Sequence, residues 1–271
     1  MSQPANPLSA SEPWNLVADG YAETTMLIFE QFAAEAIAAS HLKRGATVLD
    51  VACGPGTLAL KIARVAGQVH GIDFSPAMLA IFKKKIEDAG HGNITLHCGD
   101  AQTLPYPDAR FDAAFSLFGL MFFPERRKGF AEIYRTLKPG GSIAITSWAP
   151  VDQSPAMLTM FGALRAIKPE LPQPQRAVAT LENPDTFKHE MEEVGFKNVE
   201  IRLITKAFPV TTIPEFWESM VKGSAPIQMM KKGLGEQWPE KEKLALAYLK
   251  LALPTIPTEL TSDAWLGLGV K

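Results

Sequence analysis

Residues 48–57 read Val-Leu-Asp-Val-Ala-Cys-Gly-Pro-Gly-Thr, and this segment limits the possible folds more than any other part of the chain. The apolar run from Val48 to Val51 predicts a buried strand, and a turn through Gly54 and Gly56 follows it directly. Glycine has no Cβ, so it permits positive φ angles and lets a ligand approach the backbone. The following residues predict a helix whose free N–H groups suit a carboxylate. The segment therefore predicts a strand–turn–helix unit with a ligand site at its turn.

Strands and helices alternate through the rest of this region. The expected strands are residues 46–51, 68–72, 93–97, 111–117 and 142–148. The expected helices are residues 57–63, 76–88 and 125–137, and residues 138–141 are expected to form a turn. This alternation implies right-handed crossovers and a parallel sheet with helices on both faces. Such a sheet binds ligands at the carboxyl ends of its strands.

The flanking segments are less regular but complete the predicted fold. Helical patterns cover residues 14–42, 155–167, 185–194 and 214–252, and strand patterns cover residues 199–206 and 263–270. We therefore expect an α/β fold with a Rossmann-like, seven-stranded, mostly parallel sheet and a helical lid inserted before the last strand. The expected domains are an N-terminal arm and helix (1–42), a Rossmann-like domain (43–206 and 261–271) and the lid (207–260).

Charge and cysteine content exclude several classes of function. The 27 basic and 29 acidic residues give a net charge of −2, so no global field attracts nucleic acid or an anionic membrane. Cys53 and Cys98 are too few for a disulfide framework and lie in no metal-binding spacing. Residues 1–13 lack the features of a signal peptide, and no apolar stretch has the length of a membrane span. We expect a cytoplasmic protein without a metal site; a homodimer stays open.

Acidic residues occur where two further strands end. Asp73 follows the second strand, where a carboxylate can accept hydrogen bonds from ribose hydroxyls. Asp100 follows the third strand, and an acid there can accept a hydrogen bond from an adenine amino group. A dinucleotide fold would prefer G-x-G-x-x-G at the first turn, but Ala59 stands at the third glycine position.

Four segments in this order resemble the class I S-adenosylmethionine-dependent methyltransferases, and more narrowly their UbiE-like branch. They are VLDVACGPG, GIDFSPAML, GDAQTLPYPDARFDAAFSLFGLMFFP and LKPGG, spread over residues 46–148. Each segment alone is a weak signal, whereas the four together at this spacing are specific. The resemblance implies S-adenosylmethionine as cofactor and transfer of its methyl group by in-line displacement.

The resemblance also implies which residues contact the donor. Ala52, Cys53 and Gly54 correspond to the methionine end, Asp73 and Phe74 to the ribose, Asp100 and Ala101 to adenine, and Ser116 to the residue beside the donor. In many relatives a tyrosine of an N-terminal helix closes over the methionine end, and Tyr21 is the candidate here. Neighbouring positions complete the expected site: Asp50, Gly56, Met78, Gln102 and Leu117.

Each of these residues also has a purely structural interpretation. Gly54 and Gly56 can form a strand–helix turn without a ligand, and Asp73 and Asp100 can cap strand ends or helices. Tyr21 can be a core tyrosine. Cys53 is interpreted as a small buried residue and not a nucleophile, because no His or Asn partner is evident.

The acceptor is less constrained than the donor. The segment Ser116-Leu-Phe-Gly replaces the Asn/Asp-Pro-Pro-aromatic motif of enzymes that methylate nucleic-acid amino groups. The region after Pro155 is rich in Met, Phe, Leu and Trp, which favours a small, partly hydrophobic acceptor methylated at O, C or N. No general base is visible as a motif, so no catalytic residue is assigned. Two alternatives stay open, a nicotinamide-dependent oxidoreductase and a non-catalytic relative that acts through partners.

Overall fold

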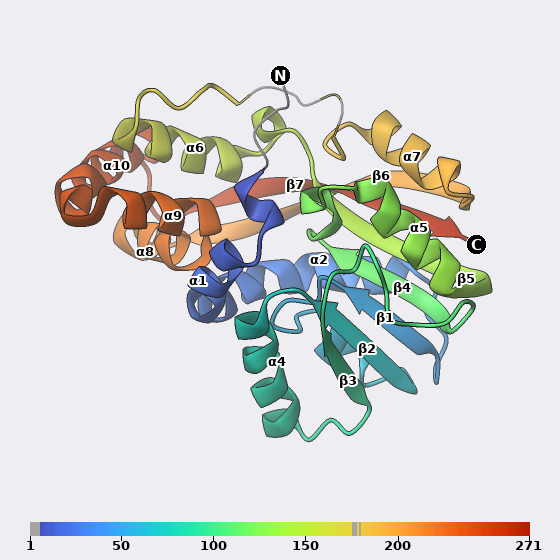
Figure 1. Cartoon of the computed structure of the whole chain (residues 1–271). Helices are drawn as coiled ribbons and strands as arrows, with labels where there is room; N and C mark the ends of the chain where they lie inside the picture. The colour runs from blue at the N-terminus through green and yellow to red at the C-terminus, as the bar shows by residue number, and fades with distance from the viewer. Residues whose placement is uncertain (1–5, 175–177, 179) are drawn as a thin grey trace.

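A single sheet forms the centre of the protein in the computed structural model, which describes residues 6–174, 178 and 180–271. Within these residues the seven strands lie in the order β3-β2-β1-β4-β5-β7-β6 (Figure 1). Their bounds are β1 (Thr47–Val51), β2 (Gln68–Asp73), β3 (Ile94–Cys98), β4 (Phe111–Leu117), β5 (Leu137–Trp148), β6 (Lys197–Val210) and β7 (Thr258–Val270). Strands β1 to β5 are parallel, and β7 pairs antiparallel with both β5 and β6. The predicted mostly parallel α/β sheet is confirmed.

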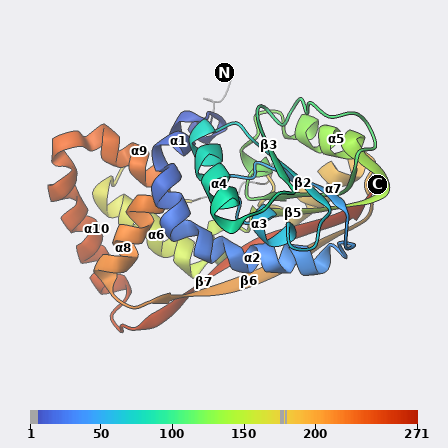
Figure 2. The same ribbon diagram turned by 90° about the horizontal axis from the view of Figure 1, so that it is seen from below.

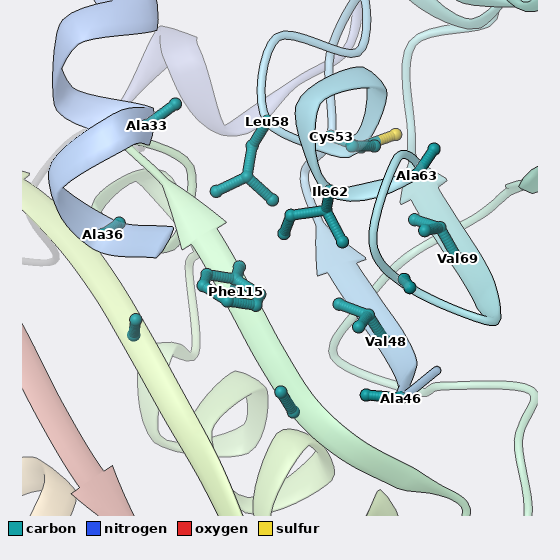
Figure 3. Close-up of a cluster of buried hydrophobic side chains, with 14 of the residues drawn as sticks. Ala33, Ala36, Ala46, Val48, Cys53, Leu58, Ile62, Ala63, Val69 and Phe115 are labelled. Atoms are coloured by element: carbon teal, nitrogen blue, oxygen red, sulfur yellow. The ribbon is translucent and has the colours of Figure 1, made fainter. Parts of the chain in front are cut away.

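Helices cover both faces of the sheet (Figure 2). One face packs against α2 (Met26–Ala39), α3 (Ala59–Ile62) and α4 (Pro76–Ala89). The other face packs against α5 (Arg126–Thr136) and α7 (Pro184–Glu193). Figure 3 shows the first of these clusters, in which Val48 and Phe115 of the sheet meet Leu58 and Ile62. Because both faces are covered, β1 and β2 are buried along almost their whole length.

Four helices form a separate group at one end of the sheet, here called the cap (Figure 1). They are α6 (Pro155–Ile167), α8 (Ile213–Gly223), α9 (Ala225–Leu234) and α10 (Trp238–Ala252). In the cap's own core, the rings of Trp217 and Trp238 stack with centroids 6.3 Å apart. The helices expected between the last two strands are therefore present, and α6 joins them from outside that insertion. The division into domains at residues 42, 206 and 260 stays a prediction.

The N-terminal helices lie between the cap and the sheet domain. Helix α1 (Glu12–Gly20) packs on α4 and also on α8 and α9. A π-helical turn, η2 (Tyr21–Thr25), joins α1 to α2. Sequence periodicity predicts one helical segment here but not the π-turn, which adds a residue to the helical repeat and marks functional positions in many helices.

Three strands are longer than the sequence predicts. β5 begins at Leu137 and not at residue 142, because Leu137 pairs with Phe111 and the register then shifts before Ser142. β6 and β7 extend together to the Val210–Thr258 pair, beyond the part of β7 that pairs with β5. Their outer ends are stabilised by a small cluster under the cap that contains Val210, Leu253 and Leu260.

Candidate active site

A small, partly open cavity lies at the carboxyl ends of β1 and β4, where the strand order of the sheet reverses. Open α/β sheets bind their ligands at this switch point. The cavity has a volume of about 30 Å³, enough for one or a few water molecules but not for a drug-sized ligand. Its lining consists of Tyr21, Phe29, Asp50, Ala52, Cys53, Gly54, Pro55, Thr57, Leu58 and Leu117.

The floor of the cavity is the glycine turn that follows β1. Its backbone enters the left-handed region at Ala52 (φ 54°), Gly54 (φ 51°) and Gly56 (φ 90°). A Cβ added to Gly54 would meet no atom within 4 Å, so this residue faces open space. A Cβ added to Gly56 would lie 2.3 Å from the ring of Phe82, which is fully buried. The first glycine therefore leaves room for a ligand, and the second allows tight packing of α4.

Asp73, at the end of β2, holds this turn in place. Its Oδ2 accepts a hydrogen bond from the Gly54 amide and its Oδ1 accepts one from the Ser75 amide, both at 2.8 Å. Burial raises the pKa of Asp73 to about 6, and the amide hydrogen bonds from Ser75 and Gly54 oppose that rise. Each carboxylate oxygen has a second lone pair, so the side chain can still accept hydrogen bonds from a ligand.

Asp50 is the most perturbed carboxyl group at the site. It is 1% exposed, and its Oδ2 has no hydrogen-bond partner among the described residues. Burial raises its pKa to about 8, and the charge of Asp73 contributes to the rise, whereas a hydrogen bond from the Ala59 amide lowers it. An unpartnered buried oxygen is costly. A ligand that brings a hydrogen-bond donor to this oxygen would satisfy it.

Tyr21 enters the cavity from η2 and contacts other aromatic residues. Its ring stacks on Phe29 with centroids 5.6 Å apart and makes an edge contact with Trp14 at 6.4 Å. Burial raises the pKa of its hydroxyl, and the charge of Asp73 raises it further, so the phenol is neutral at physiological pH. The structure thus places a neutral tyrosine opposite the glycine turn.

Aromatic side chains form a wall where β4 and β5 end. Phe118 stacks on Trp148 with centroids 4.1 Å apart, and Phe29 lies 4.8 Å from Phe118 and 5.7 Å from Trp148. Phe118 has a φ of 54°, which turns the chain sharply after β4. A Cβ on Gly119 would lie 2.3 Å from that of Ala52, so only glycine lets the two strand ends approach so closely.

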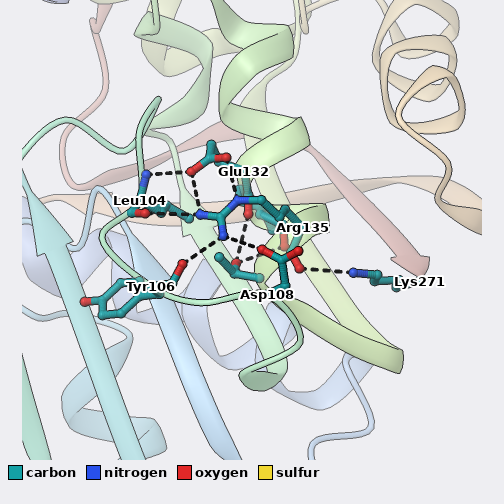
Figure 4. A network of polar contacts seen from close by, with 8 residues as sticks. Leu104, Tyr106, Asp108, Glu132, Arg135 and Lys271 are labelled. Atoms are coloured by element: carbon teal, nitrogen blue, oxygen red, sulfur yellow. Dashed lines mark hydrogen bonds and ion pairs between the residues drawn. The ribbon is translucent and has the colours of Figure 1, made fainter.

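The loop after β3 carries Asp100 and is pinned to α5 (Figure 4). The Arg135 guanidinium donates to the carbonyl oxygens of Leu104 (3.1 Å) and Tyr106 (2.8 Å) and to the carboxylates of Asp108 and Glu132. Glu132 in turn accepts a hydrogen bond from the Leu104 amide at 2.7 Å. These contacts fix the part of the loop from Leu104 to Asp108.

The cavity brings together six of the residues singled out by sequence, namely Tyr21, Asp50, Ala52, Cys53, Gly54 and Leu117. Eight others are outside its lining: Gly56, Asp73, Phe74, Met78, Asp100, Ala101, Gln102 and Ser116. Ser116 is fully buried with an unpartnered hydroxyl, Met78 packs beneath α1, and Asp100 is exposed with its oxygens accepting from Gln102.

Sequence reasoning missed Phe29, Pro55, Thr57, Leu58 and Trp148 at or beside the cavity. Pro55 and Thr57 lie within the turn motif itself. Trp148 ends the fifth strand, and the rule that ligands bind at carboxyl ends could have found it. Phe29 follows Tyr21 by eight residues, but the π-turn between them hides their common face.

Comparison with known proteins identifies the family. The methyltransferase domain family matches residues 48–141. The ubiquinone/menaquinone biosynthesis C-methyltransferase UbiE of Geobacter sp. strain M21 is 35% identical over 170 residues, which cover 56% of this chain and 71% of that protein. The chain belongs to the UbiE-like S-adenosylmethionine-dependent methyltransferases. It is an enzyme, and S-adenosylmethionine is its methyl donor, as the sequence resemblance implied.

Further relatives agree with this assignment. The demethylmenaquinone methyltransferase of Listeria welshimeri is 38% identical over 107 residues, covering 38% of this methyltransferase and 45% of the relative. Among solved structures, the [4+2]-cyclase SpnF matches with a TM-score of 0.61 and 20% identity, covering 99% of this chain and 98% of SpnF. YcgJ of Bacillus subtilis matches with a TM-score of 0.59 and 18% identity, over 89% of this chain and 98% of YcgJ. At these identities the structures show a common fold alone.

In the part of the methyltransferase that the structure describes, no helix is long and apolar enough to cross a membrane.

The raised pKa of Asp50 predicts how stability depends on pH. A carboxyl group whose pKa rises on folding contributes stability that is complete below its ordinary pKa near 4 and is lost as the pH rises through about 8. Asp73 contributes in the same sense up to about pH 6, so Asp50 dominates between pH 6 and 8. We expect Asp50→Asn to flatten the fall in unfolding free energy there, by up to about 1.4 kcal/mol per pH unit. Denaturant unfolding of both proteins without donor, at several pH values between 6 and 8, measures this change. Parallel plots of unfolding free energy against pH for the wild type and Asp50→Asn would contradict the prediction.

The pinned loop gives a second prediction. Lysine cannot bridge four groups as the planar Arg135 guanidinium does, so we expect Arg135→Lys to cost about 2 kcal/mol of unfolding free energy. Arg127 is the matched control, because it lies on the same helix but pairs with Glu193 and its side chain is 65% exposed. Arg127→Lys is expected to change stability by less than about 0.5 kcal/mol. Equal effects in chemical denaturation would show that the loop network adds nothing.

Proposed function

We propose that this methyltransferase binds S-adenosylmethionine across the carboxyl ends of β1, β2, β3 and β4 and passes its methyl group to a small, partly hydrophobic acceptor. The residues proposed to contact the donor are Tyr21, Asp50, Ala52, Cys53, Gly54, Gly56, Asp73, Phe74, Met78, Asp100, Ala101, Gln102, Ser116 and Leu117. The observation that carries the proposal is the unpartnered, buried Oδ2 of Asp50 beside the open face of Gly54.

Three features support a donor with an amino-acid end at this place. The Asp50 carboxyl group offers an acceptor for an ammonium group, which would also lower the pKa of Asp50 and favour its charged form. Gly54 offers backbone without a side chain in the way. Asp73 has lone pairs left for ribose hydroxyls after it has accepted from Gly54 and Ser75.

The volume of the cavity supports a closing role for the N-terminal segment. A space of about 30 Å³ is far smaller than the several hundred Å³ typical of small-molecule sites. Tyr21 and Phe29 supply the side of the cavity opposite the turn. Entry of the donor therefore requires these two residues to move away from the sheet, and their return would enclose it.

The acceptor is proposed to lie against the aromatic wall of Phe29, Phe118 and Trp148. Phe29 lines the cavity, and Phe118 and Trp148 pack behind it. Because Phe29 and Phe118 are buried, the acceptor would contact these rings when Tyr21 and Phe29 move away from the sheet, and such an apolar surface suits a flat or partly apolar molecule. The names of the Geobacter and Listeria relatives, which refer to quinone biosynthesis, agree with an acceptor of this kind. The Met- and Trp-rich cap is proposed to cover it.

The chemistry asks little of the protein beyond alignment and exclusion of water. The donor supplies an electrophilic methyl group on a sulfonium, and an in-line displacement requires the acceptor atom to lie opposite the leaving sulfur. Closure of the N-terminal segment over the bound donor would exclude competing water. Tyr21 stays neutral and positions the reactants, and no general base is assigned among the residues that line the cavity.

Assembly and location are part of the proposal. We infer that the acceptor is not nucleic acid, since the net charge is −2 and no basic field is present. A cytoplasmic location and a homodimer complete the proposal, and light scattering of the purified protein tests the second.

Calorimetric titration tests the function directly. We expect S-adenosylmethionine and S-adenosylhomocysteine to bind at a single site and NAD not to bind. Transfer of a labelled methyl group to a panel of phenols, quinols and amines then identifies the acceptor class. A protein that binds neither donor nor donor product would refute the proposed function, and binding of NAD alone would favour the oxidoreductase alternative.

A further inference from the structure

The π-turn η2 sits on helix α8 of the cap through two threonine hydroxyls. The Thr24 Oγ1 lies 2.8 Å from the carbonyl oxygen of Gly20 and 3.3 Å from that of Ser219. The Thr25 Oγ1 donates to the carbonyl oxygen of Gly223 at 3.4 Å. Side-chain hydroxyls of one segment therefore reach backbone carbonyls of another that lies almost 200 residues later in the chain.

Two glycines allow this approach, one on each side of the contact. A Cβ on Gly20 would lie 2.3 Å from the carbonyl oxygen of Lys222, and backbone cannot easily move aside. A Cβ on Gly223 would lie 2.1 Å from the Thr25 Oγ1 and 2.6 Å from the Thr24 Oγ1. Glycine costs stability within a helix. Glycine at both positions therefore indicates that η2 and α8 must approach closely here, because a side chain at either position would push the two segments apart.

The same turn carries Tyr21 into the cavity. Tyr21 is the first residue of η2, and Thr24 and Thr25 follow it within that single turn. The ring of Tyr21 lines the cavity and stacks on Phe29, whereas the two hydroxyls point away to α8. A salt bridge between Glu23 and Lys222, 3.3 Å long, borders the contact on its exposed side. One short segment thus joins the cavity to the cap.

We propose that α8 of the cap positions Tyr21 in the donor site through the hydroxyls of Thr24 and Thr25. The inference rests on the proposed function, since it takes Tyr21 as a donor contact. Thr24 and Thr25 are not part of the cavity lining and act through Tyr21 as positioning residues. Because entry of the donor requires η2 to move, the contact between η2 and α8 also couples donor binding to the position of the cap. Such coupling is reciprocal, so the position of the cap would in turn change the affinity for the donor.

The test replaces both threonines by valine, which keeps their shape and removes the hydroxyls. The long contacts to the carbonyl oxygens of Ser219 (3.3 Å) and Gly223 (3.4 Å) are lost, together with the 2.8 Å bond that the Thr24 hydroxyl shares with the Gly20 carbonyl oxygen. We expect the Kd for S-adenosylhomocysteine to rise about 5- to 10-fold. Thr159→Val is the matched control. Thr159 is a buried cap threonine whose hydroxyl donates to the Pro155 carbonyl oxygen at 2.8 Å without contact to η2. The control is expected to change the Kd less than two-fold.

A double-mutant cycle separates positioning from general destabilisation. In a Tyr21→Ala background, the Thr24→Val/Thr25→Val change is expected to alter the Kd by less than two-fold, because the residue that it positions is gone. Gly223→Ala disturbs the same contact between η2 and α8 from the side of the cap, and it is expected to weaken binding only when Tyr21 is present. If the valine variant does not fold, Gly223→Ala alone provides the test.

Three results would decide against the inference. Unchanged affinity in the valine and Gly223→Ala variants would overturn it, and so would equal weakening with and without Tyr21. Failure of the wild-type enzyme to bind S-adenosylhomocysteine would instead refute the proposed function, and the inference would fall with it.

Discussion

Replacing Asp73 by alanine should weaken binding of S-adenosylmethionine about 100-fold. The change removes the two carboxylate oxygens that accept the Gly54 and Ser75 amides, and with them the proposed contacts to the ribose. A 100-fold rise in Kd corresponds to a loss of about 2.7 kcal/mol in binding free energy. Hydrogen bonds to charged groups contribute about 1.5–3 kcal/mol each, so the loss of one or two of them accounts for this value. The effect has two parts. The glycine turn loses the carboxylate that holds its backbone amides, and the donor loses the proposed hydrogen bonds to its ribose.

Asp73→Asn separates these two parts. An asparagine oxygen can still accept one amide, but its NH₂ group would face the other amide, so we expect an intermediate loss of affinity. Asp112→Ala is the control at the amino end of the sheet. Asp112 also accepts a backbone amide, that of Thr47 at 2.8 Å, and pairs with Lys138. Calorimetry should find its Kd within about two-fold of wild type, and unchanged affinity in Asp73→Ala would remove Asp73 from the site.

The sheet domain could be predicted from sequence because its signals are local. The strand at Thr47–Val51 is mostly apolar and is followed by a glycine turn. The helix at Pro76–Ala89 is preceded by an N-capping serine that the sequence identifies, since the Ser75 hydroxyl accepts a hydrogen bond from the Met78 amide at 3.2 Å. The same rules placed the carboxyl ends of the strands and hence the glycine turn. Tyr21 and Asp50 of the cavity were predicted through the family resemblance and not through these local rules.

The rest depends on contacts between distant segments, which no local pattern contains. Helix α6 joins the cap because its Ala163 and Leu164 pack with Trp217 and Leu249, and nothing near residues 155–167 indicates that partner. The outer halves of β6 and β7 pair only with each other, and Pro209 obscured the strand pattern. The role of Asp73 as a brace for the turn likewise appears only when β2 lies beside β1.

Substitution by alanine should act mainly on stability at Gly56 and mainly on donor binding at Gly54. At Gly56 the new Cβ would lie 2.3 Å from the ring of Phe82, which is fully buried, at a φ of 90°. Overpacking costs about 1–3 kcal/mol and a left-handed residue about 1–2 kcal/mol, so we expect a loss of about 3 kcal/mol or more in unfolding free energy. For a chain of this size that loss lowers Tm by roughly 6–12 °C.

At Gly54 the new Cβ would meet no atom within 4 Å, so only the strain at a φ of 51° remains, about 1–2 kcal/mol. The methyl group would instead occupy the open face of the turn, and we expect the donor Kd to rise at least about 10-fold. Denaturant unfolding and calorimetry on both variants separate the two roles. Phe82→Leu supplies the decisive comparison, because a smaller side chain makes room for the Cβ at position 56. Gly56→Ala should therefore cost less in that background than in the wild type. Simple additivity would show that backbone strain, and not the contact with Phe82, requires glycine at position 56.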